Sequence, residues 1–365
     1  MEPIKNNSRP FSFYTLSFPY KGLELKEGIK GVLAHVEPGH ILKQTLFYPP
    51  SVDSEELLDI VREVYSGNLP ATSLICQPLA DGMDIGLELW CIDADVQYKN
   101  GISLLELFDS KWAFLSGIEP EPHLSFQMKC GSVLNRMHMI MNSIGFTFKH
   151  LVRTWYYIGG ILQMEGDMSR YDLLNMTRNK FYDGIWDEKG QYPASTGIGM
   201  DADSIIMNGI ALVPSPDTRV VRLENPLQIR ASDYDIPFER RPRFCRAIFI
   251  GNGRSGVMFV SGTASIRGAD VIHPNNIRDQ TYVTIENIKR LISNDNLSRY
   301  DISWDITLND IPNIRVYVKE RSYYHEVKEI CKEYFANIPQ IYLVADICRS
   351  SLLVEIEAVV AKGSA

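Results

Sequence analysis

Hydrophobic and polar positions recur along the chain in one order (strand, helix, turn, strand), and this order occurs three times. Runs of β-branched and aromatic residues predict the strands, and apolar residues spaced by three and four predict the helices. Two further helices are predicted at 131–144 and 275–293, ahead of the second and third copies. In the first copy the predicted strand, helix and closing strand are 42–48, 53–65 and 85–92, and in the second they are 151–158, 171–182 and 205–213. In the third copy the strand is 313–318 and the helix 323–334, and the closing segment 341–360 is predicted as two strands linked at 349–351.

A proline marks the equivalent turn of each copy, at Pro70, Pro193 and Pro339. Ser116 and Ser261, each followed by glycine, precede the second and third of these prolines at nearly the same distance. Self-similarity of this kind is the signature of a repeated structural unit. The sequence therefore predicts an α+β fold built from three related units, 1–105, 106–230 and 231–365.

The segments outside the repeat are less regular. Residues 11–18 alternate like a strand, 31–36 are expected to form another, and Lys-Asn-Gly at 99–101 predicts a hairpin turn. Five prolines between 214 and 243 predict a linker into the third unit. Its arginines Arg240 and Arg241 are interpreted as solvated linker charges.

Composition narrows the possible functions. With 365 residues and 45% hydrophobic content the chain can bury a large core, and its net charge of −8, with no basic stripe, argues against nucleic acid or membrane surfaces as partners. The N-terminus lacks a signal-peptide core and no stretch is long and apolar enough to span a membrane, so we expect a cytoplasmic protein. The six cysteines lack metal-binding spacing and are expected to be free thiols, and no metal or phosphate motif is present.

Glu355 and Glu357 stand out on the last predicted strand, because the period of two places both on one face of an otherwise apolar segment. Two carboxylates there are costly unless they are solvated, paired or used. A solvent-facing edge strand and a buried site are both consistent with this pattern.

Four motifs together resemble the chorismatases, which remove pyruvate from chorismate and are related to the YjgF-type imine deaminases. The motifs are RTWYYI at 153–158, YPASTGIG at 192–199, FVSGTAS at 259–265 and CRSSLLVEIE at 348–357. The resemblance covers residue 110 to the end with these motifs and the first hundred residues only by general order. It implies three YjgF-like units in one chain, forming a pseudo-trimer as a monomer, with chorismate as substrate and no cofactor.

The resemblance also implies a site. Glu355 matches the family's catalytic acid, with Glu357 as a pairing or structural partner. Cys348, and Gly262 after Ser261, match the branch that makes 3-hydroxybenzoate by an intramolecular route, where the hydrolases carry alanine. Cys348 can equally be a small buried apolar residue.

The two carboxylates of chorismate call for arginines. We expect substrate contacts from Arg246 and from Arg178, which lies one helical turn from Asn175. Arg153, on a strand among aromatic residues, is expected either to contact the substrate or to form a structural ion pair. The hydroxyl groups of Tyr192, Ser195 and Thr196 are candidate donors, and Gly262 would allow close backbone approach.

Three other functions remain to be weighed. The hydrolase branch would add water and give a dihydroxycyclohexadiene acid, and a further branch gives a mixture containing 4-hydroxybenzoate. A non-catalytic protein of the same fold would bind the metabolite unchanged. Imine deamination is disfavoured, because the deaminases carry an arginine two residues after the turn proline. The corresponding positions here are Thr72, Ser195 and Ile341 or Gln340, so none of the three turns has an arginine.

Overall fold

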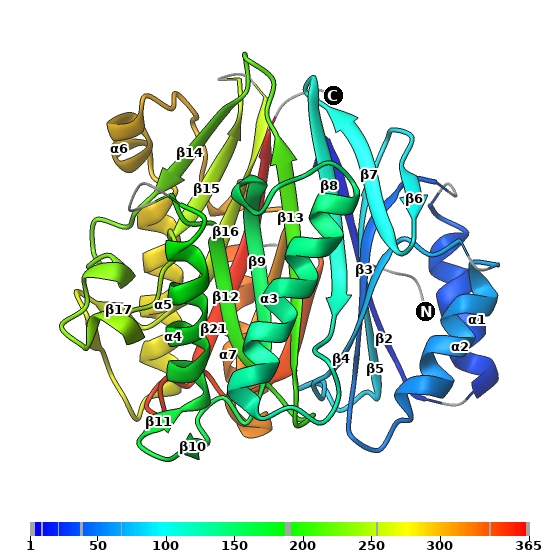
Figure 1. Ribbon diagram of the computed structural model, residues 1–365, viewed down its shortest axis with the longest axis horizontal. Coiled ribbons are helices and arrows are strands. Elements are labelled where there is room, and N and C mark those ends of the chain that lie inside the picture. Colours follow the sequence, from blue (N-terminus) through cyan, green and yellow to red (C-terminus); the bar gives the residue numbers. More distant parts are fainter. Residues whose placement is uncertain are drawn as a thin grey trace.

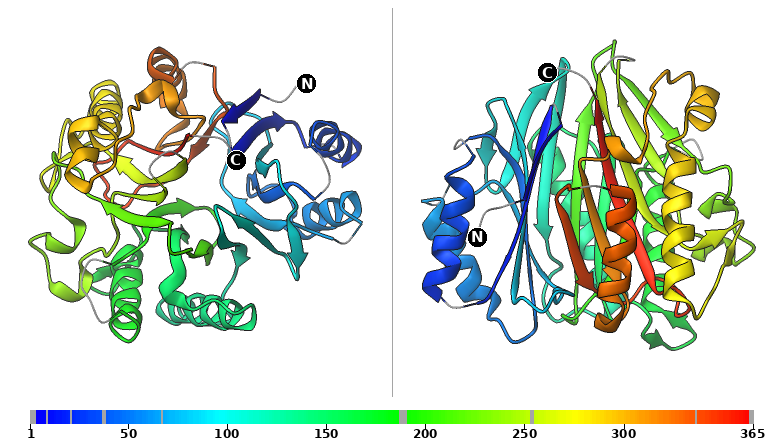
Figure 2. Two further views of the ribbon diagram at one scale, coloured as in Figure 1. Left: turned by 90° about the horizontal axis from the view of Figure 1, so that it is seen from above. Right: turned by 180° about the vertical axis from the view of Figure 1, so that it is seen from behind.

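The computed structural model describes residues 4–8, 10–20, 22–36, 39–66, 68–186, 191–252, 255–335 and 337–362. Its three large sheets surround a common centre, and the long helices lie on their outer sides (Figures 1 and 2). The mixture of helices with mainly antiparallel sheets confirms the predicted α+β class.

The first sheet contains the N-terminal copy of the repeat. Its strands, in spatial order, are β1 (Ile4–Ser8), β2 (Phe11–Phe18), β5 (Ile85–Ile92), β3 (Ile41–Tyr48) and β4 (Ala71–Cys76), with helices α1 (Gly22–Leu33) and α2 (Ser54–Val64) outside. The strand expected at 31–36 is wrong, because α1 continues to Leu33. Leu25, Ile29 and Val32 are buried at helical spacing on α1, so the apolar residues follow a period near 3.6.

The second sheet extends further toward the N-terminus than expected. Its strands are β12 (Ala194–Met200), β9 (Leu151–Gly159), β13 (Ile205–Val213), β8 (Ser110–Ile118), β7 (Ile102–Leu107) and β6 (Gln97–Lys99), with α3 (Phe126–Ser143) and α4 (Arg170–Asp183) outside. Asn100 and Gly101 have φ of 52° and 74° and form the predicted hairpin turn between β6 and β7. Helix α3 starts earlier than predicted because the Ser125 side chain caps it by accepting from the Met128 amide.

The third sheet contains the C-terminal copy. Its strands are β14 (Arg219–Leu223), β15 (Ala247–Gly251), β16 (Gly256–Ala264), β21 (Val354–Lys362), β19 (Asn313–Val318) and β20 (Gln340–Val344), with α5 (Ile277–Leu291), α6 (Asn294–Leu297) and α7 (Tyr324–Phe335) outside. The linker expected at 214–243 is wrong in part, because β14 pairs with β15 inside this sheet. Small hairpins form from β10 (Met164–Glu165) with β11 (Met168–Ser169) and β17 (Ile266–Arg267) with β18 (Asp270–Val271).

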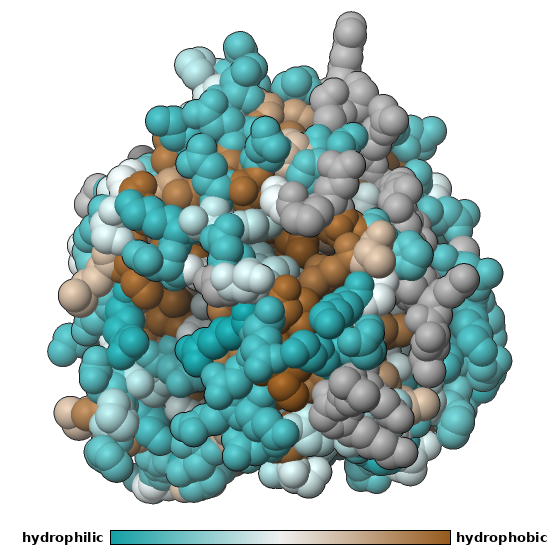
Figure 3. Space-filling view, turned by 90° about the vertical axis from the view of Figure 1, so that its right-hand side faces the viewer, coloured by the Kyte–Doolittle hydropathy of each residue, from teal (hydrophilic) through white to brown (hydrophobic). Residues whose placement is uncertain are grey.

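The inner faces of the three sheets share one hydrophobic core. Trp90, Trp155 and Phe259, one from each sheet, meet there, with ring centroids 6.0 Å apart for the two tryptophans and 6.1 Å for Trp90 and Phe259. The outer faces pack against the helices, so most strands are buried on both sides. The face that carries α1 and α2 is mainly hydrophilic, with hydrophobic side chains visible in recesses (Figure 3).

The sheets are joined by backbone hydrogen bonds at three junctions, with the strand as donor at two of them and as acceptor at the third. At each one, the segment that follows the parallel strand of one sheet hydrogen-bonds to the corresponding parallel strand of the next. The bonds are Val344 N to Pro78 O (2.8 Å), Gly199 N to Asp346 O (2.8 Å) and Asp201 N to Cys76 O (2.8 Å). The chain thus links the first sheet to the third, the third to the second and the second to the first. None of the described helices has the length and hydropathy needed to cross a membrane.

Candidate active site

Strand β21 places Glu355 and Glu357 inside the protein. It lies between β16 and β19, so an edge strand is excluded. Both carboxylates are on one face of the strand, as predicted. Val359 on this face packs into the central core, whereas Ile356 on the other face packs toward the helices. Glu355 is 5% exposed and Glu357 6% exposed, and two buried acids so close in sequence need separate explanations.

Glu355 lines a cavity of about 460 Å³ between the second and third sheets. One wall comes from α4 and β12, the other from β16 and β21, and the segments around 234–246 and 348–352 complete it. Its lining side chains with polar or aromatic groups include Tyr171, Asn175, Arg178, Ser195, Tyr234, Asp235, Arg240, Phe244, Arg246, Asp270, Cys348, Arg349 and Glu355.

The Glu355 carboxyl is held in its protonated form near neutral pH. Burial raises its pKa to about 8, with a further contribution from the negative charge of Glu357 and an opposing one from Arg153 and Arg246. A carboxylic acid with such a pKa can donate a proton at neutral pH, as a general acid must.

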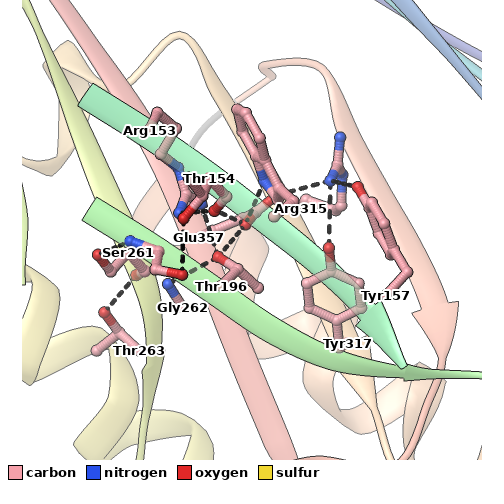
Figure 4. Close-up of polar contacts among 12 residues, drawn as sticks. Arg153, Thr154, Tyr157, Thr196, Ser261, Gly262, Thr263, Arg315, Tyr317 and Glu357 are labelled. Atoms are coloured by element: carbon pink, nitrogen blue, oxygen red, sulfur yellow. Dashed lines mark hydrogen bonds and ion pairs between the residues drawn. The ribbon is translucent and has the colours of Figure 1, made fainter. Parts of the chain in front are cut away.

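Glu357 does not line this cavity, and Figure 4 shows the polar groups that surround it. Its oxygens accept from Arg153 Nη2 (2.7 Å) and Trp155 Nε1 (3.0 Å), and pair with Arg315 Nη1 (2.8 Å). Burial alone would raise the pKa of Glu357, but the two arginines and the hydrogen bonds from Thr196 and Trp155 lower it below its ordinary value. The two acids of β21 are therefore set to opposite protonation states by their surroundings.

Thr196 connects Glu357 to the cavity wall. Its hydroxyl donates to Glu357 Oε2 (2.5 Å) and accepts from Arg153 Nη2 (2.6 Å) and from the Gly262 amide (3.0 Å), as Figure 4 shows. One donor and two acceptor positions are all that a hydroxyl has, so this group is fully used. It fixes the backbone at Gly262, which lies directly against the Glu355 carboxyl.

Gly262 cannot carry a side chain without moving the acid. A Cβ at this position would lie 2.0 Å from Glu355 Oε1 and 3.2 Å from Thr196 Cγ2. We therefore expect Gly262→Ala to lower kcat for the reaction proposed below by about 10- to 100-fold, because a displacement near 1 Å misdirects the proton donor. Steady-state kinetics on purified variants measures this.

The matched control for this prediction is Gly131→Ala. Gly131 lies within α3, and the nearest atom to an added Cβ is a Thr177 methyl at 3.9 Å, so alanine fits there. Gly131→Ala should keep full activity. Unchanged kcat in Gly262→Ala would show that the acid tolerates displacement.

Arginines dominate the rest of the cavity. Arg178, Arg240, Arg246 and Arg349 line it, and the buried Nε atoms of the first three have no hydrogen-bond partner among the described residues. Asn175 also has an unpartnered buried amide nitrogen. A buried donor without a hydrogen-bond partner costs free energy, so the donors of this wall favour an acceptor-rich, anionic ligand.

Aromatic rings and hydrogen bonds hold these arginines in place. Arg246 Nη2 donates to the Tyr234 hydroxyl (2.8 Å), and Arg178 Nη2 donates to Asn175 Oδ1 (2.7 Å). The Arg178 guanidinium also lies over the Tyr156 ring, 5.5 Å from its centroid. The guanidinium groups are therefore preorganised, which reduces the entropy lost on binding.

Of the expected site residues, the structure brings Glu355, Cys348, Arg246, Arg178, Ser195 and Gly262 to the cavity. Arg153 and Thr196 lie behind it on Glu357. Tyr192 lines a neighbouring cavity of about 380 Å³ with Arg243, which pairs with Asp183. The thiol of Cys348 is neutral, because burial raises its pKa to about 12. All six cysteines are free.

Sequence reasoning missed part of the cavity wall. Tyr171, Tyr234 and Arg349 were not among the expected site residues, and the interpretation of Arg240 as a solvated linker charge is wrong, because it lines the cavity. Arg349 had a signal, since it follows Cys348 within one of the four motifs. Tyr234 had none, because nothing in the local sequence shows that its segment folds over α4 and β16.

The fold and the site define a protein of the YjgF-like α+β class with a buried acid beside an arginine-lined cavity. The family descriptions "Chorismatase FkbO/Hyg5-like, N-terminal" and "Endoribonuclease L-PSP" match residues 88–211 and 241–362. A 3-hydroxybenzoate synthase of Streptomyces hygroscopicus is 32% identical over 280 residues, which cover 75% of this chain and 81% of that protein. The chain belongs to the chorismatase family.

Two further relatives agree with this assignment. A chorismatase of Streptomyces hygroscopicus is 30% identical over 63% of this chain and 66% of that protein. A chorismatase crystal structure superposes with a TM-score of 0.74 at 21% identity, covering 98% of this chain and all of that one. This similarity shows that the fold extends through the N-terminal hundred residues, where the sequence resemblance was weak.

Proposed function

We propose that this protein converts chorismate to 3-hydroxybenzoate and pyruvate. The observation that carries the proposal is the protonated Glu355 carboxyl facing a cavity whose other walls present four arginines. The relative that is 32% identical over most of its length is named 3-hydroxybenzoate synthase, which supports the same product.

The proposed reaction begins with protonation of the terminal methylene of the enolpyruvyl ether by Glu355. The proton adds to carbon, the double bond supplies the electron pair, and an oxocarbenium ion results. The carboxylate left on Glu355 then lies beside the new positive charge and stabilises it. Chorismate has the composition of 3-hydroxybenzoate plus pyruvate, so this route consumes no water, whereas the hydrolase route takes up one.

The arginines of the cavity can bind the two negative charges of the substrate. Chorismate carries two carboxylates, and Arg246 and Arg178 approach the cavity from opposite sides, one from the third-sheet wall and one from α4. Arg240 and Arg349 add two further cations. Bidentate arginine contacts would hold the enolpyruvyl group against Glu355.

In the intramolecular route the neighbouring ring hydroxyl captures the cation. Loss of a ring proton then breaks that hydroxyl's bond to the ring and makes the ring aromatic, and the remaining hemiketal collapses to 3-hydroxybenzoate and pyruvate.

Cys348 and Gly262 are proposed to favour this capture over capture by water. A neutral thiol occupies volume at the cavity wall without presenting a strong hydrogen-bond partner for water. We expect Cys348→Ala to shift the product from 3-hydroxybenzoate toward the dihydroxycyclohexadiene acid, because the smaller side chain admits water next to the cation. Chromatography of the products measures the ratio.

The matched control for the cysteine is Cys331→Ala. Cys331 is fully buried in α7, away from the cavity, so its replacement should cost stability and leave the product ratio unchanged. An identical ratio in Cys348→Ala and the unmodified protein would assign Cys348 to packing alone.

Incubation of the purified chain with chorismate tests the function directly. We expect pyruvate and 3-hydroxybenzoate in equal amounts, with pyruvate measured by a coupled dehydrogenase and the ring product by chromatography. The diene acid as main product would place the chain in the hydrolase branch. Bound but unchanged chorismate would instead indicate a metabolite-binding protein.

We further propose that the chain is a monomeric pseudo-trimer of three YjgF-like units. The cyclic set of junction hydrogen bonds supports this arrangement, since the segment after the parallel strand of each unit bonds to the parallel strand of the next. The boundaries at 105 and 230 stay predictions. The pairing of β6 and β7 with β8, and of β14 with β15, supports units that divide between β5 and β6 and between β13 and β14. Size-exclusion chromatography with light scattering tests the monomer.

A further inference from the structure

The junction between the first and third sheets repeats the architecture of the active-site cavity. There, α7 and β20 occupy the places of α4 and β12, because β20 pairs in parallel with β19 as β12 does with β9. Strand β2 provides the opposite wall, as β16 does in the active site. Both views in Figure 2 place β2 beside the strands of the third sheet.

A second cavity lies at this repeated position. Its volume of about 480 Å³ is close to that of the active-site cavity. Leu79 and Asp81, from the connection that follows β4, line this second cavity. The corresponding connection after β20 provides Cys348 and Arg349 to the active-site cavity. The lining residues on α7 and β20 are Tyr324, Lys328, Lys332, Gln340, Ile341 and Tyr342, and those on β2 are Thr15, Leu16 and Ser17.

The third junction, between the first and second sheets, is formed by β4, β8 and β13. Asn208 donates to Ser73 Oγ (2.9 Å) and accepts from the Gly117 amide (2.7 Å). A Cβ on Gly117 would lie 2.7 Å from Thr72 O, so the backbones are in direct contact there.

The second cavity has the chemistry to bind an anion next to a ring. Lys328 Nζ donates to the Tyr324 hydroxyl (2.6 Å), and no carboxylate of the described chain lies within ion-pair distance of it. Lys332 instead pairs with Glu329, and Asp81 accepts from Ser17 (3.0 Å). Two of the three Lys328 donors are thus available to a ligand.

Two tyrosines form the apolar part of this cavity. The Tyr324 and Tyr342 rings pack edge to face with centroids 5.4 Å apart, and the Tyr342 hydroxyl is already bonded to Gln340 Oε1 (2.6 Å). Leu79 and Ile341 extend the apolar surface. Such walls suit a flat ring of one-ring size, since aromatic faces and edges attract each other at these distances.

We propose that the cavity between β2 and α7 is a second ligand site that binds a small aromatic carboxylate, with the carboxylate on Lys328 and the ring against Tyr324 and Tyr342. Asp81 provides the one carboxyl group among the described lining residues, and it is exposed and accepts from Ser17. No buried acid like Glu355 lines the cavity, so this site binds and does not catalyse. The product of the proposed reaction belongs to this ligand class, and the choice of probe below rests on that proposed function.

Binding of 3-hydroxybenzoate to the full chain tests the proposal. Equilibrium dialysis should give two molecules per chain at saturation. Lys328→Met should leave one and weaken the lost site at least about tenfold, as expected when a charged hydrogen-bond donor is removed. Lys328→Arg, which keeps the cation, should bind two. One molecule or none per chain in the unmodified protein, or equal binding by Lys328→Met, overturns the proposal.

Two further variants identify which site is lost. Arg246→Met removes a cation of the active-site cavity and should leave the Lys328-dependent molecule bound. Lys289→Met removes an exposed lysine of α5 that pairs only with Glu286, and should bind two. If the chain releases no pyruvate from chorismate, the proposed function fails, while the binding ratio of the variants still decides whether the second site exists.

Discussion

Replacing Glu355 by glutamine is expected to lower kcat for pyruvate release by at least about a thousandfold, in the range found when a general acid that must protonate carbon is removed. The amide has nearly the same shape and still fits against Gly262, but it cannot donate a proton to the methylene. Because Glu355 carries a proton in the folded protein near neutral pH, the neutral amide should not destabilise the fold. Single-turnover kinetics with chorismate and thermal unfolding together measure both effects.

The matched control is Glu224→Gln. Glu224 is another partly buried acid, and burial raises its pKa to about 7, but it lines the neighbouring cavity instead of the active-site cavity. The kcat of Glu224→Gln should stay within about threefold of that of the unmodified protein. Substantial pyruvate release by Glu355→Gln would move the proton donor elsewhere, and Glu357 would be the next acid to consider.

The sequence predicted the repeat well because each element depends on local pattern. Strands β5, β13 and β19 have their predicted bounds, and the alternation of Val354, Glu355, Ile356 and Glu357 was enough to place both acids on one face. The hairpin turn at Asn100 and Gly101 could also be predicted from local sequence, because these residues readily adopt positive φ. The helix in place of the strand at 31–36 shows the limit of a six-residue window, which cannot distinguish periods of 2 and 3.6.

The site was harder to predict because its partners come from different units. Arg153 was expected to meet either the substrate or a structural partner, since an arginine among aromatic residues requires an anion. The anion it meets is Glu357, 204 positions away in sequence, and only the packing of the second sheet against the third brings them together. The family resemblance identified Glu355, but which arginines face the cavity depends on how the segment around Tyr234 folds.

Glu357→Gln is expected to move the alkaline limb of the pH dependence of kcat/KM to lower pH. Activity requires protonated Glu355 and should fall as pH rises through its pKa of about 8. Glu357 is one cause of that high value, because its negative charge disfavours ionisation of Glu355. Removing the charge leaves Arg153 without its carboxylate partner, so the pKa of Glu355 falls and the acid loses its proton at lower pH.

The same substitution should also lower the free energy of unfolding by about 3–5 kcal/mol, the usual cost of leaving buried charges unpaired. Glu88→Gln separates the two effects. Glu88 is a buried partner of Arg315 and Lys43 but does not contribute to the pKa of Glu355, so its loss should cost similar stability and leave the alkaline limb in place. An equal shift of the limb in both variants, or none in Glu357→Gln, would mean that Glu357 acts on the reaction only by holding the sheets together.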